Sequence, residues 1–393
     1  MDDLRIGVIG ASGRGRLAGH AHKPGEGSRV VACCDVSAQG LSEARAAYGD
    51  ETLLFDDYRA LLERRDVDAV FVATPDFLHE EHAVAALEAG KAVYLEKPMA
   101  ITIAGCDRIL ETARRTRSRL YVGHNMRHMP FVVKMKELID GGAIGEVKTA
   151  WCRHFVGNGP EYYFKDWHAE RRYATSLLLQ KAAHDLDVLH WLCGSYTRRV
   201  TAMGDLMLMD KIDSRSPATD GPMRADIADI PGTAWPPMAQ KNMNPVIDVE
   251  DVSLVLMRMD NGVLASYQQC HFSPDYWRNY TIIGTEGRIE NEGDGEPGTR
   301  IRIWNRRHNW HASGDIEIDP GSSEGDHGGA DPRIVAEFIR FAREGGPTAT
   351  SPIAARNSVA TGCLAAESLR TGSEPRDVPP VSAEVAAYFG ERG

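Results

Sequence analysis

The sequence predicts an α/β fold in which an N-terminal, doubly wound parallel sheet is followed by a second domain. The chain has 393 residues, more than one ordinary hydrophobic core accommodates, so we expect two domains. From Leu4 to Val122, short apolar runs of strand length alternate with helical segments, the pattern of a parallel sheet with helices on both faces. A glycine-rich turn follows the first apolar run, where sheets of this kind bind their ligands.

The elements of the first domain, residues 1–123, follow from this alternation. Strands are expected at Leu4–Ile9, Arg29–Cys34, Leu53–Phe55, Ala69–Ala73, Ala92–Leu95 and Leu120–Val122. Helices are expected at Leu41–Tyr48, Asp57–Arg64, His79–Ala89 and Ile101–Arg115. Ligands of parallel sheets lie beyond the carboxyl ends of the strands. Thr74-Pro75 and Glu96-Lys97-Pro98 each follow a strand and are therefore expected at the ligand-binding edge.

The glycine-rich turn, Gly10-Ala11-Ser12-Gly13-Arg14-Gly15, predicts a Rossmann-type dinucleotide site. It joins a strand to a helical stretch, and the next strand ends about 20 residues later at Asp35. Its N–H groups suit a pyrophosphate, and the Asp35 carboxylate suits ribose hydroxyls. Ser12 replaces the usual second glycine, and a glycine is displaced to position 13. The expected cofactor contacts are Gly10, Ser12, Gly13, Arg14, Gly15 and Asp35; the plainer alternative is a turn that only connects two elements.

The charge of Asp35 favours NAD over NADP as the cofactor. A carboxylate at this position repels the 2′-phosphate of NADP, and the next residues, Val36-Ser37-Ala38, offer no arginine to receive it. The alternative is that Asp35 only caps the following turn.

Several further motifs resemble the Gfo/Idh/MocA oxidoreductase family and occur in its order over nearly the whole chain. They are Glu96-Lys97-Pro98, Thr74-Pro75 with His79, Val122-Gly123-His124-Asn125, Ile144-Gly145-Glu146-Val147, His184-Asp185-Leu186-Asp187 with Trp191-Leu192, and Gly284-Thr285-Glu286-Gly287. The resemblance implies a dehydrogenase of sugars or cyclitols. It adds Thr74, Pro75, His79, Glu96 and Lys97 to the expected cofactor contacts and suggests a cis peptide before Pro98.

By this resemblance, residues 124–393 form an α+β domain with an open, mostly antiparallel sheet. Its helices cover one face, and the other face commonly makes a homodimer or homotetramer. The sequence itself supports strands at Glu146–Arg153, Asp251–Met259, Val263–Gln269, Tyr280–Ile283 and Arg300–Trp304, with a hairpin turn at Asn261-Gly262. Helices at Pro332–Arg343 and Ala354–Leu369 are expected to pack back toward the first domain. An insertion at about 205–248 suggests a lid or an oligomer contact.

Lys97 is the first candidate catalytic residue. Oxidising a carbinol requires a group that accepts the hydroxyl proton, and a lysine whose pKa is depressed by burial can do so. The family resemblance gives this role, or a hydrogen bond to the reacting oxygen, to the lysine of the Glu-Lys-Pro motif. The alternative is an exposed lysine in a turn before Pro98.

His184 is the second candidate. Leu177–Leu192 is expected to form one helix on which His184, Asp187 and Trp191 share a face, and a histidine can relay a proton near neutral pH. The alternative is a histidine satisfied in the core. The family usually has an aspartate four residues before this histidine, but here the position is Gln180. Lys181 follows it, either as an ion pair with Asp185 or as a second active-site cation.

Other side chains are expected to line the substrate site. The candidates are Asn125, Arg127, Lys165, Trp167, Arg171, Gln180, Lys181, His184 and His327. A tryptophan among several cations suits a sugar ring that carries a carboxylate or sulfonate. Solvated charges on an irregular loop are the equal alternative.

Composition narrows the class of protein further. A net charge of −11 disfavours nucleic acid as a partner, and no apolar run approaches the ~18 residues of a membrane span. The seven cysteines lack disulfide or zinc spacing, which favours reduced thiols and the cytoplasm, and we expect no catalytic metal.

Three functions are compatible with these features. The first is reversible hydride transfer between NAD and a secondary hydroxyl of a sugar, sugar acid, glycoside or cyclitol. The second is hydrolysis of a glycoside through transient sugar oxidation and elimination, as in some relatives, on a possibly anionic sugar. The third, an NAD-binding sensor without catalysis, is disfavoured by the presence of Lys97 and His184.

Overall fold

The computed structural model describes residues 2–219, 221–223, 234–321 and 326–390, and the chain divides into two compact units. The first unit comprises residues 1–128, 325–356 and 380–393, and the second comprises residues 129–324 and 357–379. Helix α10 (Asp326–Glu344) therefore belongs to the first unit, whereas most of α11 (Pro352–Arg370) belongs to the second. In the described part of the chain, no helix is both long enough and apolar enough to span a membrane.

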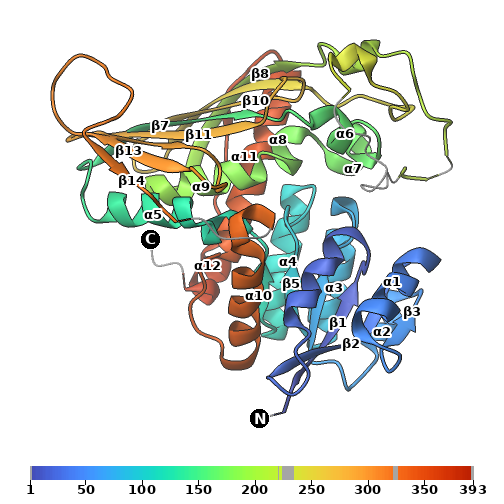
Figure 1. Ribbon diagram of the computed structural model, residues 1–393. Coiled ribbons are helices and arrows are strands. Elements are labelled where there is room, and N and C mark those ends of the chain that lie inside the picture. The colour runs from blue at the N-terminus through green and yellow to red at the C-terminus, as the bar shows by residue number, and fades with distance from the viewer. Residues whose placement is uncertain (1, 220, 224–233, 322–325, 391–393) are drawn as a thin grey trace. The chain divides into compact units, whose positions relative to one another are not determined.

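The first unit contains the predicted parallel sheet (Figure 1). Its strands are β1 (Leu4–Ile9), β2 (Ser28–Cys34), β3 (Leu53–Phe55), β4 (Ala69–Val72), β5 (Ala92–Leu95) and β6 (Leu120–Val122). Their order in the sheet is β3-β2-β1-β4-β5-β6, with every pair parallel. The strand order reverses between β1 and β4, and a doubly wound sheet binds its ligand at this switch point. The expected Rossmann-type sheet is confirmed.

The helical elements of the first unit agree only in part with the predicted helices, because those at Asp76–Leu78, Asn125–His128 and Ala383–Phe389 were not predicted. They are η1 (Gly13–Ala21), α1 (Ala38–Tyr48), α2 (Tyr58–Leu62), η2 (Asp76–Leu78), α3 (His79–Glu88), α4 (Ile103–Thr116), η3 (Asn125–His128) and α12 (Ala383–Phe389). The segment after the glycine turn is a 3₁₀ helix. Ser37 and Thr102 cap α1 and α4 by accepting the N–H of Gly40 and Gly105.

An aromatic core joins α10 to the parallel sheet of the same unit. Phe338 of α10 packs edge-on against Phe71 of β4, with ring centroids 5.1 Å apart, and Phe71 stacks on Tyr94 of β5 at 4.6 Å. Ile334 and Val335 are fully buried in the same cluster. Burial of each large side chain contributes about 1.5–3 kcal/mol, so this helix, which is remote in sequence, is an integral part of the first unit.

The second unit is built on a nine-stranded sheet in the order β14-β13-β12-β11-β7-β10-β9-β8-β15. Its strands are β7 (Val147–Phe155), β8 (Thr197–Asp205), β9 (Val252–Met259), β10 (Leu264–Cys270), β11 (Trp277–Gly284), β12 (Arg288–Glu292), β13 (Arg300–Trp304), β14 (Ile316–Ile318) and β15 (Arg376–Asp377). Only β7 and β10 pair in parallel among these strands, so the mostly antiparallel sheet is confirmed. Gly262, with φ of +88°, forms the expected hairpin between β9 and β10.

In the described part of the second unit, the helical elements other than α11 are mostly short, and only α5 and α9 reach 11 residues. They are α5 (Pro130–Asp140), α6 (Gly159–Tyr163), η4 (Trp167–Ala169), α7 (Arg171–Ala174), α8 (Leu177–Gln180), α9 (Ala183–Cys193), η5 (Met209–Lys211) and η7 (Pro237–Ala239). Helix α9 packs against β7, β10 and β11. Along β7, Ala150, Cys152 and His154 are buried while their neighbours are partly exposed, so His154 is buried on the same side of the strand as Ala150 and Cys152.

The prediction of one continuous helix over Leu177–Leu192 was wrong. The structure divides it into α8 and α9, because the N–H groups of both Lys181 and Ala182 donate to the carbonyl of Leu177 at 3.0 Å. The second of these bonds spans five residues instead of four, which is the hydrogen bonding of a π-type turn. Lys181 therefore lies at a break in the helix.

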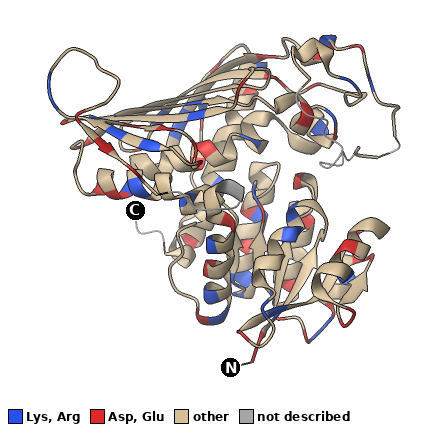
Figure 2. Ribbon diagram, viewed as in Figure 1, with Lys and Arg blue, Asp and Glu red and all other residues tan. Residues whose placement is uncertain are grey.

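Part of the insertion near 205–248 packs into a small core that it shares with other segments of the second unit. Met209, Ile212 and Met243 are buried against Phe164 and Val249. The residues at 220 and 224–233 lie outside the described part of the chain. Lys and Arg residues are interspersed with Asp and Glu in both units (Figure 2), and all seven cysteines are free thiols.

Candidate active site

The glycine turn has the conformation that close approach to a ligand requires. Gly10 has φ of +83°, and a Cβ at this residue would lie 2.9 Å from the backbone of Ala73 and Thr74. A Cβ at Gly15 would lie 1.9 Å from the carbonyl oxygen of Gly10, so only glycine fits there. Gly13 has φ of +54° and nothing within 4 Å of its Cβ position, which leaves its backbone open to a bound molecule.

Asp35 lies beside this turn and is held as a carboxylate. Its Oδ2 accepts the backbone N–H of Ser12 at 3.0 Å and the Ser12 hydroxyl at 2.8 Å, and its Oδ1 accepts both groups of Ser37 at 2.9 Å. Burial opposes ionisation, but these hydrogen bonds outweigh it and lower the pKa of Asp35. Ser12 in place of the usual glycine thus ties the turn to the acidic residue.

The Glu96-Lys97-Pro98 loop is fastened to the glycine turn by Arg14. The Arg14 Nε donates to Oε1 of Glu96 at 2.7 Å, and the two terminal nitrogens of the Arg14 guanidinium donate to Asp331 of α10 at 2.5 and 3.0 Å. Oε2 of Glu96 accepts the N–H of Lys97 at 3.0 Å. Burial alone would lower the pKa of Arg14, but the two carboxylates raise it, so the guanidinium stays charged. The half-buried Lys97 is therefore anchored next to the turn, and the expected cis peptide before Pro98 is confirmed.

His79 connects the two loops at the strand ends. Its Nδ1 lies 2.7 Å from the carbonyl oxygen of Pro98 and its Nε2 lies 2.8 Å from that of Thr74. The ring is fully buried. His79 stays a predicted cofactor contact, and in this structure both of its ring nitrogens lie against backbone carbonyls, which ties together the loops that carry Thr74, Pro75 and Lys97.

The segment after β6 contains two predicted substrate residues. Asn125 donates from Nδ2 to Asp331 at 3.2 Å, and its buried Oδ1 accepts no hydrogen bond within the described residues. A hydroxyl of a ligand would satisfy that oxygen. Arg127 is buried, and its Nη1 donates to the carbonyl of Ala349 at 2.9 Å. At least this nitrogen of the guanidinium is therefore used to fix the backbone near Ala349. The side chain of His327, in the first turn of α10, lies outside the described part.

The second unit contains His184, Gln180 and Lys181 on or between α8 and α9. His184 and Gln180 are both buried. The ion pair between Lys181 and Asp185, one of our two alternatives, is not formed; the Lys181 Nζ instead faces the rings of Tyr163 at 5.6 Å and Tyr276 at 6.0 Å. Burial, followed by the charge of Arg278, lowers the pKa of Lys181 to about 8.

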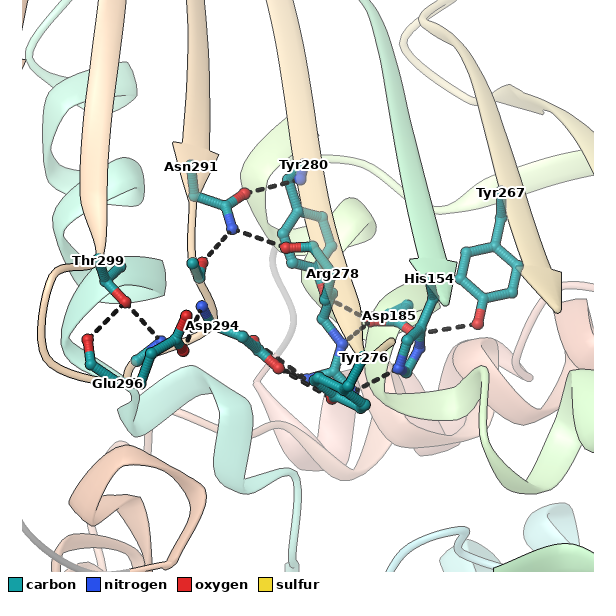
Figure 3. Close-up of polar contacts among 12 residues, drawn as sticks. His154, Asp185, Tyr267, Tyr276, Arg278, Tyr280, Asn291, Asp294, Glu296 and Thr299 are labelled. Atoms are coloured by element: carbon teal, nitrogen blue, oxygen red, sulfur yellow. Dashed lines mark hydrogen bonds and ion pairs between the residues drawn. The ribbon is translucent and has the colours of Figure 1, made fainter. Parts of the chain in front are cut away.

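The carboxylate of Asp185 lies within a buried cluster of polar side chains that contact it (Figure 3). It accepts His154 at 2.8 Å and Tyr267 at 3.0 Å through Oδ2, and through Oδ1 it accepts Tyr280 and pairs with Arg278 at 3.0 Å. Arg278 also pairs with Asp294 at 3.0 Å, and Asp294 accepts the Tyr276 hydroxyl at 2.9 Å. We call His154, Asp185, Tyr267, Tyr276, Arg278, Tyr280 and Asp294 the Asp185 cluster. It connects α9 to β7, β10 and β11.

The sequence did not predict this cluster, and the one partner it offered for Asp185, Lys181, is not among the residues that contact it. Its signal is an alternation in which polar residues share the inward face of a strand, as His154 follows Cys152 in β7 and Arg278 precedes Tyr280 in β11. Buried polar side chains at apolar positions indicate a paired network. Burial and Arg278 lower the pKa of His154 to about 3, so this ring is neutral.

The other predicted substrate residues differ in their surroundings. Trp167 is buried and stacks on His168, with ring centroids 3.7 Å apart. Arg171 donates to Glu250 at 3.0 Å, and Arg370 pairs with the same carboxylate at 2.7 Å, so Arg171 is used within the fold. Lys165 is half-buried and makes no ion pair with the described residues.

Comparison with known proteins identifies the family. Residues 4–124 match the oxidoreductase family with an NAD-binding Rossmann fold, GFO_IDH_MocA, and residues 132–290 match the GFO/IDH/MocA C-terminal domain. The chain belongs to the Gfo/Idh/MocA oxidoreductase family. Its first unit is thus an NAD-binding domain, and the open turn at Gly13 and the ionised Asp35 fit that cofactor.

Individual Gfo/Idh/MocA proteins are similar over part or all of the chain. Inositol 2-dehydrogenase of Salmonella typhimurium is 33% identical over 189 residues, which are 48% of this chain and 52% of that protein. Inositol 2-dehydrogenase 1 of Saccharopolyspora erythraea is 37% identical over 201 residues, 50% of this chain and 57% of that protein. The chain therefore spans about half the length of these curated relatives. The structure of levoglucosan dehydrogenase with NADH and L-sorbose is 21% identical, covers 97% of this chain and all of that one, and has a TM-score of 0.76.

Proposed function

We propose that the protein is an NAD-dependent dehydrogenase that oxidises a secondary hydroxyl of a sugar, sugar acid, glycoside or cyclitol. The observation that carries the proposal is the chain of contacts from the glycine turn through Arg14 and Glu96 to Lys97. This chain anchors a candidate proton acceptor beside the nucleotide-binding turn. The names of the relatives, inositol 2-dehydrogenase and levoglucosan dehydrogenase, agree with a cyclic polyol as substrate.

In this proposal each residue has a separate task. Bound NAD supplies the hydride acceptor. Lys97 accepts the proton of the substrate hydroxyl, and His184 hydrogen-bonds the same substrate and stabilises charge at its oxygen. Asn125 Oδ1 accepts a substrate or cofactor hydroxyl. His79 and Arg14 hold the loops.

The proposal is tested by incubating purified protein with NAD and a panel of inositols, sugars, sugar acids, sulfosugars and aryl glycosides. NADH absorbance and free sugar are followed in the same samples. NADH formed in step with a ketone product supports the dehydrogenase. Release of sugar without accumulation of NADH would instead support the hydrolytic function, which Gln180 in place of the family's aspartate makes a specific second candidate. If the protein binds NAD but shows neither dehydrogenase nor hydrolase activity, the remaining function is that of an NAD-binding sensor without catalysis.

Lys181 is expected to select substrates that carry an anion. Its ammonium group has two tyrosine rings beside it and lacks a carboxylate within ion-pair distance among the described residues. A charge-assisted hydrogen bond contributes about 1.5–3 kcal/mol, so Lys181→Met should raise KM for the best carboxylated or sulfonated sugar by roughly 10- to 100-fold. The KM for the neutral analogue of the same sugar should change far less in this variant.

The pH dependence of this preference follows from the charge of Lys181. Arg278, Asp185, Asp294, His154 and His271 act on this amine electrostatically, and its pKa is lowered to about 8. The anion preference should therefore be present below pH 8 and decline as Lys181 loses its proton above it. Lys148→Met, at an exposed residue of β7, is the matched control. Equal effects of Lys181→Met on anionic and neutral substrates would exclude a role in anion selection.

We further propose that the protein forms a homo-oligomer through the outer face of the second sheet. Met203, Leu254, Leu256 and Leu264 lie on β8, β9 and β10 and are 48–65% exposed. Exposed apolar patches of this kind mark interfaces. Leu256→Glu should convert the wild-type oligomer to a monomer in light scattering, whereas Leu53→Glu in β3 should not. A monomeric wild type would contradict the proposal.

A further inference from the structure

The loop between β13 and β14 brings three potential metal ligands to one point. Nε2 of His308 lies 3.0 Å from Nε2 of His311 and 3.1 Å from Oδ1 of Asp315. All three ligand atoms lie within 4.8 Å of one another. The Asp315 side chain is only 8% exposed and that of His308 is 30% exposed, so the group is partly shielded from water.

The remaining polar atoms of these side chains are satisfied by the loop itself. His308 Nδ1 lies 2.7 Å from the carbonyl oxygen of Asn309, which can only accept, so Nδ1 carries the hydrogen and Nε2 presents a lone pair. His311 Nδ1 lies 3.1 Å from the Ser313 hydroxyl. Such contacts are the ones that orient histidine ligands around a metal ion.

Asp315 is oriented in the same way. Its Oδ2 accepts the N–H groups of Asn305 and Arg306 at 2.9 and 3.0 Å, which leaves Oδ1 to face the histidines. The loop backbone is fixed as well, because Trp304 Nε1 donates to the carbonyl of His311 at 2.9 Å and Asp315 N–H donates to that of Ile303 at 2.8 Å. The three ligands are thus preorganised on a hairpin and do not depend on long flexible side chains.

The spacing and chemistry of the ligands suit a first-row transition metal. Zinc binds imidazole nitrogen at about 2.0–2.1 Å in tetrahedral geometry, which places two ligand atoms about 3.3 Å apart. The observed separations are 3.0 and 3.1 Å. Two imidazoles with one carboxylate favour zinc or a similar ion over magnesium or calcium, which prefer all-oxygen sites.

We propose that the β13–β14 hairpin binds one divalent transition-metal ion, best matched by zinc, through His308, His311 and Asp315. The fourth coordination position is open to water. The ion acts as a clip on the hairpin, since ligands that are assembled only in the folded loop couple metal binding to its stability. This site uses none of the residues assigned to the cofactor or the substrate, and the proposal is independent of the dehydrogenase reaction.

The test uses the full-length protein without a histidine tag, stripped with a chelator and then titrated with Co²⁺ and Zn²⁺. One Co²⁺ per chain should bind with the visible absorption of a tetrahedral site, and Zn²⁺ should displace it and raise the melting temperature. His308→Ala and His311→Ala should each weaken binding by more than the roughly 10- to 100-fold typical of losing an outer partner. His20→Ala, at an exposed histidine of the first unit, should bind as the wild type does.

Two results would overturn the metal site. Absence of binding at micromolar metal would mean that a shared proton, not a cation, joins the two rings. Binding that survives both substitutions would assign the metal to other residues. Melting curves in chelator establish that each variant is folded, so a loss of binding cannot be attributed to unfolding.

Discussion

Lys97→Met is expected to abolish most of the dehydrogenase activity while leaving NAD binding intact. General acid–base catalysis by one positioned group contributes about 10²- to 10⁴-fold, so kcat should fall within that range. NAD affinity, measured by calorimetry, should change little because Glu96 and Arg14 hold the loop through contacts that do not involve the lysine side chain. Stopped-flow measurement of NADH formation reports the chemical step directly.

Lys97→Arg separates proton transfer from simple charge. Arginine retains the positive charge but does not give up its proton. If Lys97 is the proton acceptor, the Lys97→Arg variant should therefore be nearly as inactive as the Lys97→Met variant. Recovery of most activity by arginine would instead indicate that Lys97 only supplies a cation to the reacting oxygen. Lys148→Met removes an exposed lysine that pairs with Glu146 and serves as the control.

The first unit was predictable because its signals are local. Strand β1, β3, β5 and β6 boundaries match the expected ones, since each strand is a short apolar run that ends at a turn. The roles of Gly10 and Asp35 in the turn are likewise set by a few neighbouring residues. The contact from Arg14 to Asp331 was not predictable, because it joins residues 317 positions apart.

Two features of the second unit were not predicted, and each has its own physical reason. Strand β12 (Arg288–Glu292) carries three charged residues among five, so it lacks an apolar run, yet its ladder with β11 and β13 forms. The break at Lys181 was not predicted because Leu177–Leu192 contains no Gly or Pro that would mark it, and it appears only in the backbone hydrogen bonds of Lys181 and Ala182.

The second large effect is expected from Asp185→Asn, which should destabilise the protein by about 3–5 kcal/mol, the cost of removing one partner from a buried ion pair. Asparagine keeps the shape of the side chain but removes the charge that faces Arg278 and leaves a set of donors, His154, Tyr267 and Tyr280, competing for one oxygen. Chemical denaturation measures the change. Asp377→Asn is the matched control, because the exposed Asp377 carboxylate lies 3.6 Å from Arg199. This substitution should lower the free energy of unfolding by less than about 1 kcal/mol.

Acid should reveal the same cluster in the wild-type protein. Burial would raise the pKa of Asp185, but Arg278 and His154 outweigh it and lower that pKa below its usual 3.8. Burial lowers the pKa of His154 and His271 to about 3, so the unfolded chain binds more protons than the folded one. The free energy of unfolding should therefore decrease as the pH falls from about 6.5 toward 3, first through the histidines and then, below about 4, through Asp185. In Asp185→Asn the final part of this decrease should be lost, whereas an unchanged pH profile would mean that the carboxylate is not the charged partner of Arg278.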